Sequence, residues 1–294
     1  MTARLLVFGR RGQVAGALAR ATAPFEMTFA GRERLDLAAD APDIAGLIAA
    51  LNPAAVINAS AYTAVDAAEA EPEACARLNH HAPVAMARAC QAADIPFVHF
   101  STDYVFDGEK GAPYVETDPL GPLNIYGRAK ADGEAALEAL AAEGARVATL
   151  RTCWVFSDAR TGFVGAMVRR AAEHDEAVVV ADQWGSPTPA GACAEAALAV
   201  TRALLDREPA ARGIFHAAGG DGLARADLAE AIFQRLPRRP RLRRIAAADY
   251  PTPARRPRDT RLSSAKLERV LGWRAPPLGE SLDACLLGVE ASAR

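Results

Sequence analysis

The sequence has few cysteines and no long run of apolar residues. Its 294 residues include five cysteines, with no Cys-x-x-Cys pair and no Cys/His spacing typical of a zinc site. No stretch approaches the ~20 apolar residues of a membrane span. The apolar run at residues 5–8 is too short for a secretory signal. These absences predict reduced thiols, a cytoplasmic location and no membrane partner.

Neither sign of charge dominates the sequence. The 34 basic and 36 acidic side chains give a formal net charge of −2, and only three of the basic residues are lysine. A balanced charge gives no field that would draw the chain to nucleic acid, so we expect no nucleic-acid partner. The length corresponds to about two domains at ~150 residues each.

Short apolar runs alternate with alanine-rich helical stretches, a pattern typical of a parallel sheet covered on both faces. It predicts an α/β fold with a doubly wound, Rossmann-like parallel sheet and a smaller C-terminal lobe. We expect a dinucleotide-binding domain of residues 1–152, to which residues 177–212 return, and a substrate-binding lobe of residues 153–176 and 213–294. The strands are expected at residues 4–9, 26–30, 54–58, 95–101, 146–151 and 177–181, and a long helix at 72–93.

A glycine turn follows the first expected strand and opens the first expected helix. Gly9 and Gly12 stand in a G-x-x-G spacing, which is weaker than the G-x-G-x-x-G fingerprint. Glycines allow a tight turn and let a pyrophosphate approach the helix N-terminus. The turn therefore predicts a dinucleotide site, although a plain strand-to-helix turn explains the same two glycines.

The end of the second strand predicts which dinucleotide binds. NAD-binding proteins have an acidic residue there for the ribose 2′-hydroxyl. This sequence has Arg32 after a glycine, with Arg10 and Arg11 in the glycine turn and Glu33 beside Arg32. Arginines clamp a 2′-phosphate through paired hydrogen bonds. We therefore expect NADPH as the cofactor, with NADH as the alternative. The alternative interpretation of these arginines is that they are solvated loop charges that bind no ligand.

Three further residues predict carbonyl reduction. Tyr126 and Lys130 are four positions apart and share a helix face. A phenol has a pKa of about 10, which a neighbouring ammonium lowers, so the phenol becomes a usable proton donor. Thr102 follows the strand at 95–101, where a substrate carbonyl would lie at the mouth of the sheet. The tyrosine–lysine pair alone is weak evidence, and Thr102 strengthens it.

With this trio, the chain resembles the extended short-chain dehydrogenase/reductase superfamily. Within it, the chain is similar to the dTDP-4-dehydrorhamnose reductase family. The similarity rests on segments spread along the whole sequence: GRRGQV at 9–14, NASAYTAVDAAE at 58–69, STDYVFDG at 101–108, PLNIYGRAK at 122–130, RTCWVF at 151–156, DQWGSPT at 182–188 and YPTPARRPRDTRL at 250–262.

The resemblance implies roles for individual residues. The implied cofactor contacts at the pyrophosphate, the adenine and the nicotinamide are Gly12, Gln13, Val14, Asp36, Leu37, Ala61, Tyr62, Thr63, Tyr126 and Lys130. The implied substrate contacts are Thr102, Asp103, Trp154 and Arg256. For four of these residues a purely structural role is the alternative: Thr63 as a helix cap, Asp103 as a turn residue, Trp154 as a core residue and Arg256 as a solvated charge.

The implied activity is NADPH-dependent reduction of the C4 keto group of a nucleotide-linked 4-keto-6-deoxyhexose. Hydride transfer itself requires no metal. Some family members bind Mg²⁺ at a dimer interface through a glutamate on the first helix, where this chain has Ala17. We therefore expect no metal and a monomer or weak homodimer. A nucleotide-sugar epimerase or dehydratase, and a non-catalytic NADP-binding regulatory subunit, stay open as alternatives.

Overall fold

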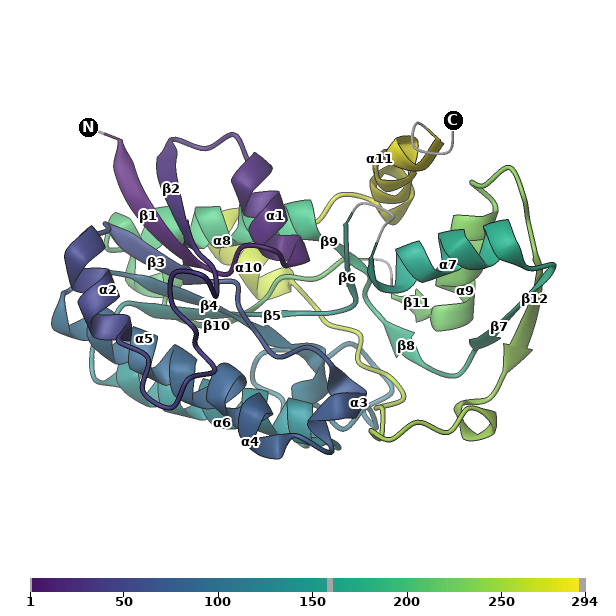
Figure 1. Ribbon diagram of the computed structural model, residues 1–294, viewed down its shortest axis with the longest axis horizontal. Helices are drawn as coiled ribbons and strands as arrows, with labels where there is room; N and C mark the ends of the chain where they lie inside the picture. The colour runs from purple at the N-terminus through teal and green to yellow at the C-terminus, as the bar shows by residue number, and fades with distance from the viewer. Residues whose placement is uncertain (1, 158–160, 221, 291–294) are drawn as a thin grey trace.

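A six-stranded parallel sheet forms the centre of the protein (Figure 1). The computed structural model describes residues 2–157, 161–220 and 222–290. The strands lie in the order β10-β5-β4-β3-β1-β2, and every adjacent pair is parallel. They are β1 (Ala3–Phe8), β2 (Phe25–Ala30), β3 (Ala55–Asn58), β4 (Phe97–Thr102), β5 (Val147–Thr152) and β10 (Gly213–His216). The predicted doubly wound fold is confirmed.

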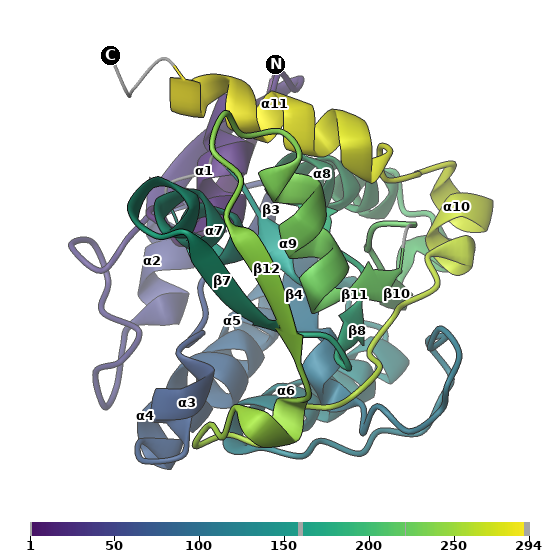
Figure 2. The same ribbon diagram turned by 90° about the vertical axis from the view of Figure 1, so that its right-hand side faces the viewer.

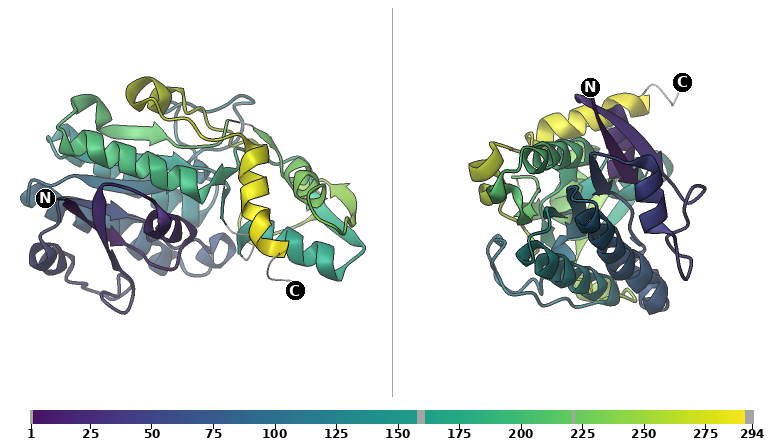
Figure 3. Two further views of the ribbon diagram at one scale, coloured as in Figure 1. Left: turned by 90° about the horizontal axis from the view of Figure 1, so that it is seen from above. Right: turned by 90° about the vertical axis from the view of Figure 1, so that its left-hand side faces the viewer.

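Helices cover both faces of this sheet, which explains why its strands are apolar throughout. Leu5 and Val7 of β1 pack in one core with α1 (Gln13–Arg20), α8 (Ala190–Leu205) and α10 (Ala265–Leu271). Leu6 and Phe8 point the other way, into a core with α2 (Ile44–Leu51), α5 (Ala82–Ala92) and α6 (Ile125–Ala142). Figure 3 shows both helical layers. Alternating side chains of each strand therefore hold two cores together.

Two strands lie elsewhere than expected. The predicted strand at 177–181 is β7 (Glu176–Val180), which pairs with β12 (Arg241–Ile245) in the smaller lobe (Figure 2). The run at 213–217, expected in that lobe, contains β10, which pairs with β5 as the sixth strand of the central sheet. Both runs are short and apolar, and such a pattern does not specify which sheet a strand joins. The domain boundaries themselves stay a prediction.

The smaller lobe has its own apolar core. It combines β7 with α7 (Gly162–Glu173), α9 (Arg225–Phe233) and α11 (Leu278–Glu290). Two short pairs complete it: β6 (Val155–Phe156) with β9 (Thr188–Pro189), and β8 (Trp184–Gly185) with β11 (Leu223–Ala224). Residues 250–262, which we call the strap, run from this lobe back to the larger part of the molecule, where the N–H of Tyr114, in the connection between β4 and α6, donates to Arg261 O. Within the described ranges, no helix has the length and apolar character to span a membrane.

The helix expected at 72–93 is interrupted. It consists of α4 (Pro72–Ala76), a π-helical turn (Arg77–His81) and α5, after the short α3 (Val65–Ala68). Pro83 has no N–H to donate to the carbonyl of Asn79, four residues earlier, so the regular ladder is broken there. Single π turns are frequent at functional sites. This one turns the side chain of Asn79 toward the loop after β3.

A buried ion pair fixes α6 on the sheet. Arg151 of β5 and Glu134 of α6 are 2% and 1% exposed, and Arg151 Nη2 lies 2.7 Å from Glu134 Oε2. Arg151 Nε bonds the same carboxylate at 3.0 and 3.1 Å. The planar guanidinium matches the carboxylate through several parallel hydrogen bonds. The helix that carries Tyr126 and Lys130 is therefore held in one position against β5.

Replacement of Glu134 by glutamine should destabilise the protein by about 3–5 kcal/mol, because Arg151 would be left as an uncompensated buried charge. Urea unfolding at pH 7 measures this. Glu138→Gln, one turn further along α6 at an exposed position, is the matched control and should change stability by less than about 0.5 kcal/mol. Equal stability of the two variants would show that the buried pair contributes nothing.

Candidate active site

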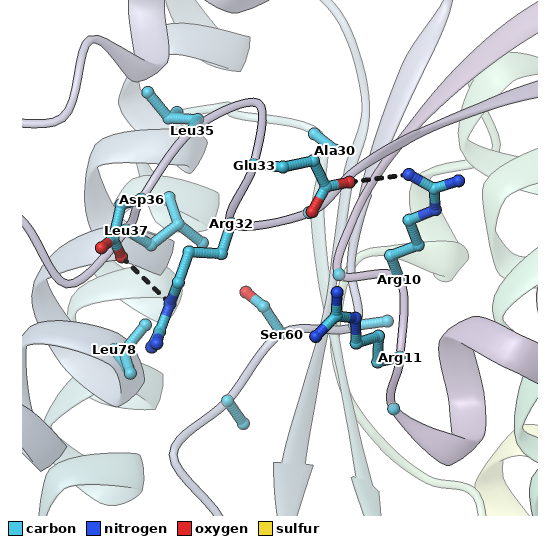
Figure 4. A pocket seen from close by; sticks show the side chains of 15 residues that line it. Arg10, Arg11, Ala30, Arg32, Glu33, Leu35, Asp36, Leu37, Ser60 and Leu78 are labelled. Atoms are coloured by element: carbon cyan, nitrogen blue, oxygen red, sulfur yellow. Dashed lines mark hydrogen bonds and ion pairs between the residues drawn. The ribbon is translucent and has the colours of Figure 1, made fainter.

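A pocket of about 580 Å³ lies beyond the carboxyl ends of β1, β2 and β3. Parallel sheets bind ligands at this edge. The pocket is lined by the glycine turn, by residues 30–33 and 35–37 at and after the end of β2, and by residues 59–61 after β3 (Figure 4). Of the predicted cofactor contacts, it brings together Gly9, Arg11, Gly12, Arg32, Asp36, Leu37 and Ala61.

The glycine turn fits a pyrophosphate. Gly9 has φ 106°, and a Cβ there would lie 2.9 Å from Ala59 O, so only glycine allows the turn after β1 to lie this close to the backbone that follows β3. Gly12 is the N-cap of α1 and brings no side chain to cap it. The N–H groups of the first helical turn, which include those of Gln13 and Val14, therefore remain available for an anion.

Gln13 also has a structural role. Its Nε2 donates to Val155 O at 3.1 Å, and its Oε1 accepts from Ser157 Oγ at 2.9 Å. These bonds tie the start of α1 to the segment where the smaller lobe begins. Only the backbone of Gln13 is left for the predicted contact with a pyrophosphate.

Three arginines surround the mouth of the pocket. Arg10 Nη1 lies 2.8 Å from Glu33 Oε1, and this bond is the main reason that the pKa of Glu33 is lowered. Arg32 Nε lies 3.5 Å from Asp36 Oδ1, and its side chain is 76% exposed. Arg11 lines the same pocket (Figure 4). Glu33 therefore neutralises Arg10, while Arg11 and the loosely paired Arg32 are placed for a 2′-phosphate.

An apolar wall stands on the other side of the pocket. It is formed by Leu37, which was predicted, and by Leu35 and Leu78, which were not. Leu35 lies two positions before Leu37, and this spacing is a local signal that the sequence contains. Leu78 comes from the π-helical turn, more than 40 positions away, and no local pattern indicates it. A flat apolar wall of this kind suits an adenine ring.

The loop after β3 is clamped by Asn79, which is fully buried. Asn79 Oδ1 accepts from the Tyr62 N–H and its Nδ2 donates to Tyr62 O, both at 3.0 Å. The Tyr62 hydroxyl donates to Glu71 Oε2 at 2.8 Å, which raises the pKa of the phenol. Thr63 is exposed and does not cap α3, whose N-cap is Ala64 without a side-chain bond. The capping alternative for Thr63 is therefore wrong.

Thr102, Tyr126 and Lys130 meet where β4 ends beside the start of α6. Asn124 caps α6, because its Oδ1 accepts from the Gly127 N–H at 2.8 Å. The Thr102 hydroxyl is close enough to that of Tyr126 to act on its pKa. Lys130 is 2% exposed, and its Nζ donates to Phe100 O on β4 at 2.8 Å. The three predicted catalytic side chains therefore form one group.

Burial governs the protonation of this group. It raises the pKa of Tyr126, and the neighbouring Thr102 hydroxyl opposes the rise only in part. The prediction that the pKa of Tyr126 is lowered is wrong for this structure, because desolvation and the nearby charge of Asp103 both raise it. Burial also lowers the pKa of Lys130 to about 8. The tyrosine is therefore protonated at neutral pH, and the lysine titrates near the upper end of the physiological range.

Asp103 lies under this group, with 3% of its surface exposed. Its Oδ1 accepts from Thr102 Oγ1 at 2.9 Å, and its Oδ2 accepts from Cys153 Sγ at 3.0 Å and Thr260 Oγ1 at 2.5 Å. Burial raises the pKa of the Asp103 carboxyl against these three donors. All of these bonds are to protein groups, so direct contact of Asp103 with the sugar stays a prediction.

Trp154 and Arg256 stand on the lobe side of the trio. Trp154 has φ 43°, an uncommon conformation for a bulky residue, and such strain is found mainly at functional sites. Its ring packs so closely on Gly185 that a Cβ there would lie 2.4 Å from Trp154 Cε2. Arg256 is paired with both carboxylate oxygens of Asp66, at 2.9 and 2.8 Å. Within the described ranges, no cluster of His, Cys, Asp and Glu is suited to hold a metal ion.

The doubly wound sheet, the glycine turn and the Thr–Tyr–Lys group define a dinucleotide-dependent oxidoreductase of the short-chain dehydrogenase/reductase type. The comparisons with known proteins narrow this class. The model of the RmlD substrate binding domain family matches residues 3–290, so the chain belongs to that family.

Several relatives of similar length are dTDP-4-dehydrorhamnose reductases. The chain is 41% identical to a dTDP-4-dehydrorhamnose reductase of Sinorhizobium fredii over 95% of both chains. It is 36% identical to one of Burkholderia thailandensis over 96% of this chain and 98% of the relative. Among solved structures, a dTDP-4-dehydrorhamnose reductase of Bacillus anthracis in complex with NADP has TM-score 0.89 and 25% identity, and the match covers 98% of this chain and 100% of that one.

Lys130→Met should change how stability depends on pH. A lysine whose folded pKa is about 8 and whose unfolded pKa is about 10.4 releases its proton earlier in the folded state. Between these pKa values the unfolded chain binds more protons than the folded chain, so the free energy of unfolding of the wild type rises with pH. Relative to Lys130→Met, which has no such group, the wild type should therefore become more stable as pH rises from 8 to 10. Urea unfolding at several pH values measures the difference. A difference independent of pH would contradict the lowered pKa.

Proposed function

We propose that this chain reduces dTDP-4-dehydrorhamnose to dTDP-L-rhamnose with NADPH. The observation that carries the proposal is the placement of Thr102, Tyr126 and Lys130 beside one another, at the same sheet edge as a pocket suited to a dinucleotide. Reductase relatives that match over nearly their whole length support the choice of substrate. We further propose that the smaller lobe and the strap supply the substrate contacts.

The proposed chemistry divides between cofactor and protein. NADPH, when bound, supplies the hydride for the C4 carbon of the keto sugar. Tyr126 gives its proton to the carbonyl oxygen, so the carbonyl gains a hydride at carbon and a proton at oxygen and becomes an alcohol. Thr102 holds that oxygen with its single hydroxyl proton, which in the present arrangement points to Asp103. The Lys130 ammonium stabilises the phenolate that Tyr126 becomes.

The proposed activity is tested by NADPH oxidation with dTDP-4-dehydrorhamnose beside its UDP and GDP counterparts. We expect turnover, fastest with the dTDP sugar. Protein that purifies with bound NAD and consumes no NADPH would instead indicate an epimerase or dehydratase. Tight NADPH binding without turnover of any keto sugar would indicate a regulatory subunit.

The proton-donor role of Tyr126 predicts a large loss on replacement by phenylalanine. Tyr126→Phe keeps the ring but removes the proton, and positioned acid catalysis contributes ~10²–10⁴-fold, so kcat should fall by about that factor. Thr102→Val should cost less, because it removes an orienting hydrogen bond and no transferred proton. Steady-state kinetics measure both, with NADPH affinity as the control that should persist. A Tyr126→Phe enzyme near the wild-type rate would overturn the assignment.

The preference for NADPH is tested at Arg32. Arg32→Ala should weaken NADPH binding about tenfold and leave NADH binding nearly unchanged, because only NADPH carries the 2′-phosphate. The lower end of the usual range for a charge-assisted bond is expected, since the side chain is 76% exposed. Fluorescence titration measures both affinities. Arg34→Ala, also exposed but outside the pocket, is the matched control. A wild type that prefers NADH would contradict the hypothesis.

We also propose a cytoplasmic enzyme that is a monomer or weak homodimer. Five cysteines without a disulfide support a reducing compartment. Ala17 of α1, where a metal-binding glutamate stands in some relatives, supports the absence of a metal-linked dimer.

A further inference from the structure

Arg225, the first residue of α9, is a cation without a side-chain hydrogen bond in the part of the chain that the structure describes. Its Nε is buried and has no hydrogen-bond partner. Among the described residues, no carboxylate or carbonyl accepts a hydrogen bond from its guanidinium. The faces of the guanidinium are covered instead: its Cζ lies 4.0 Å from the centre of the Trp154 ring and 5.1 Å from that of Phe163. Stacking of this kind leaves the N–H groups at the edge of the plane available for a ligand.

The anions near Arg225 are already engaged. Asp103 lies within electrostatic range, but its carboxylate accepts bonds from three other side chains. Asp227 and Glu230, on the same helix as Arg225, both pair with Arg244. A partly buried guanidinium that the protein itself does not neutralise points to an anion that arrives from outside.

The position of Arg225 relative to the proton donor fits one part of a nucleotide sugar. Tyr104 is near both: its ring meets that of Tyr126 edge-on at 5.8 Å, and its hydroxyl is within electrostatic range of Arg225. In a nucleotide-linked hexose the diphosphate is attached at C1, across the sugar ring from C4. Its cation must therefore lie beside the proton donor and not in contact with it.

We propose that Arg225 binds the diphosphate of the nucleotide-sugar substrate, with its guanidinium oriented by Trp154. This inference rests on the proposed function, which supplies a substrate with a diphosphate. Planar guanidinium groups match phosphate oxygens through paired hydrogen bonds. Arg256, the arginine predicted as a substrate contact, is already neutralised by both oxygens of Asp66. Arg225 lies outside the pocket of the glycine turn, so the cofactor phosphates do not compete for it.

The tight contact between Trp154 and Gly185 gives Arg225 its orientation. Gly185 leaves no room for the indole to retreat, since any Cβ there would overlap it. The guanidinium of Arg225 contacts the same indole ring. The strained backbone of Trp154 is then explained by the position that its ring must take.

The test compares dTDP with thymidine, which lacks phosphate, as inhibitors of the wild-type, Arg225→Met and Arg225→Lys enzymes with saturating NADPH. Arg225→Met should weaken dTDP about ten- to a hundredfold and raise the KM of the keto sugar by a similar factor, with kcat and thymidine inhibition nearly unchanged. Arg225→Lys should recover part of the dTDP affinity, because it keeps the positive charge but loses the planar guanidinium that makes paired hydrogen bonds. Arg239→Met, which removes an exposed charge from the same lobe, is the control and should behave as wild type.

Two outcomes would overturn the diphosphate site: unchanged dTDP affinity in Arg225→Met, or an equal loss of dTDP and thymidine binding, which would show a structural role. If Arg225→Met fails to fold, the test rests on Arg225→Lys. A dTDP affinity of Arg225→Lys equal to that of the wild type would then contradict the proposal. Turnover of the keto sugar by the wild type tests the proposed function separately. If the wild type turns over the keto sugar but Arg225→Met binds dTDP normally, the proposed diphosphate site is wrong and the proposed function stands.

Discussion

The buried carboxyl of Asp103 is the point on which the geometry of the site depends. It joins Thr102 at the end of β4, Cys153 just after β5 and Thr260 on the strap. Burial of a carboxylate costs several kcal/mol unless donors surround it, and hydrogen bonds to a charged group contribute roughly 1.5–3 kcal/mol each. Here the three donors come from three separate segments of the chain. The requirement to satisfy one carboxyl thus brings two strand ends and the strap to the same place.

The opposite side of the site is held by α6. Glu134 of this helix pairs with Arg151 of β5, and Lys130 of the same helix bonds the carbonyl of Phe100 on β4. These contacts fix the helix against both strands, one and two turns along from Tyr126. Only three lysines occur in the whole chain, and this one is almost fully buried. The proton donor therefore stands on a rigid element, while the residues proposed to recognise the substrate come from the lobe.

Much of the site was predictable because its signals are local. Tyr126 and Lys130 share a helix face by spacing alone, Thr102 stands at a strand end, and the glycine turn directly follows β1. Contacts between distant segments left no such signal. Arg225 and Leu78 reach the site through packing, and Asn79 does so because a π turn replaces the expected regular helix. The sheets that β7 and β10 join were predicted wrongly for the same reason, since an apolar run does not identify the strand beside which it lies.

The raised pKa of Tyr126 follows from this construction and suits the direction of the reaction. A reductase must begin with a protonated phenol, whereas an enzyme that oxidises an alcohol needs a phenolate to accept the proton. Burial between β4 and α6 keeps the proton on Tyr126 at neutral pH. The same burial lowers the pKa of Lys130 to about 8, so its charge is present below that pH, when the phenolate forms. One desolvated environment therefore prepares the acid for proton transfer and keeps close by the cation that stabilises the product of that transfer.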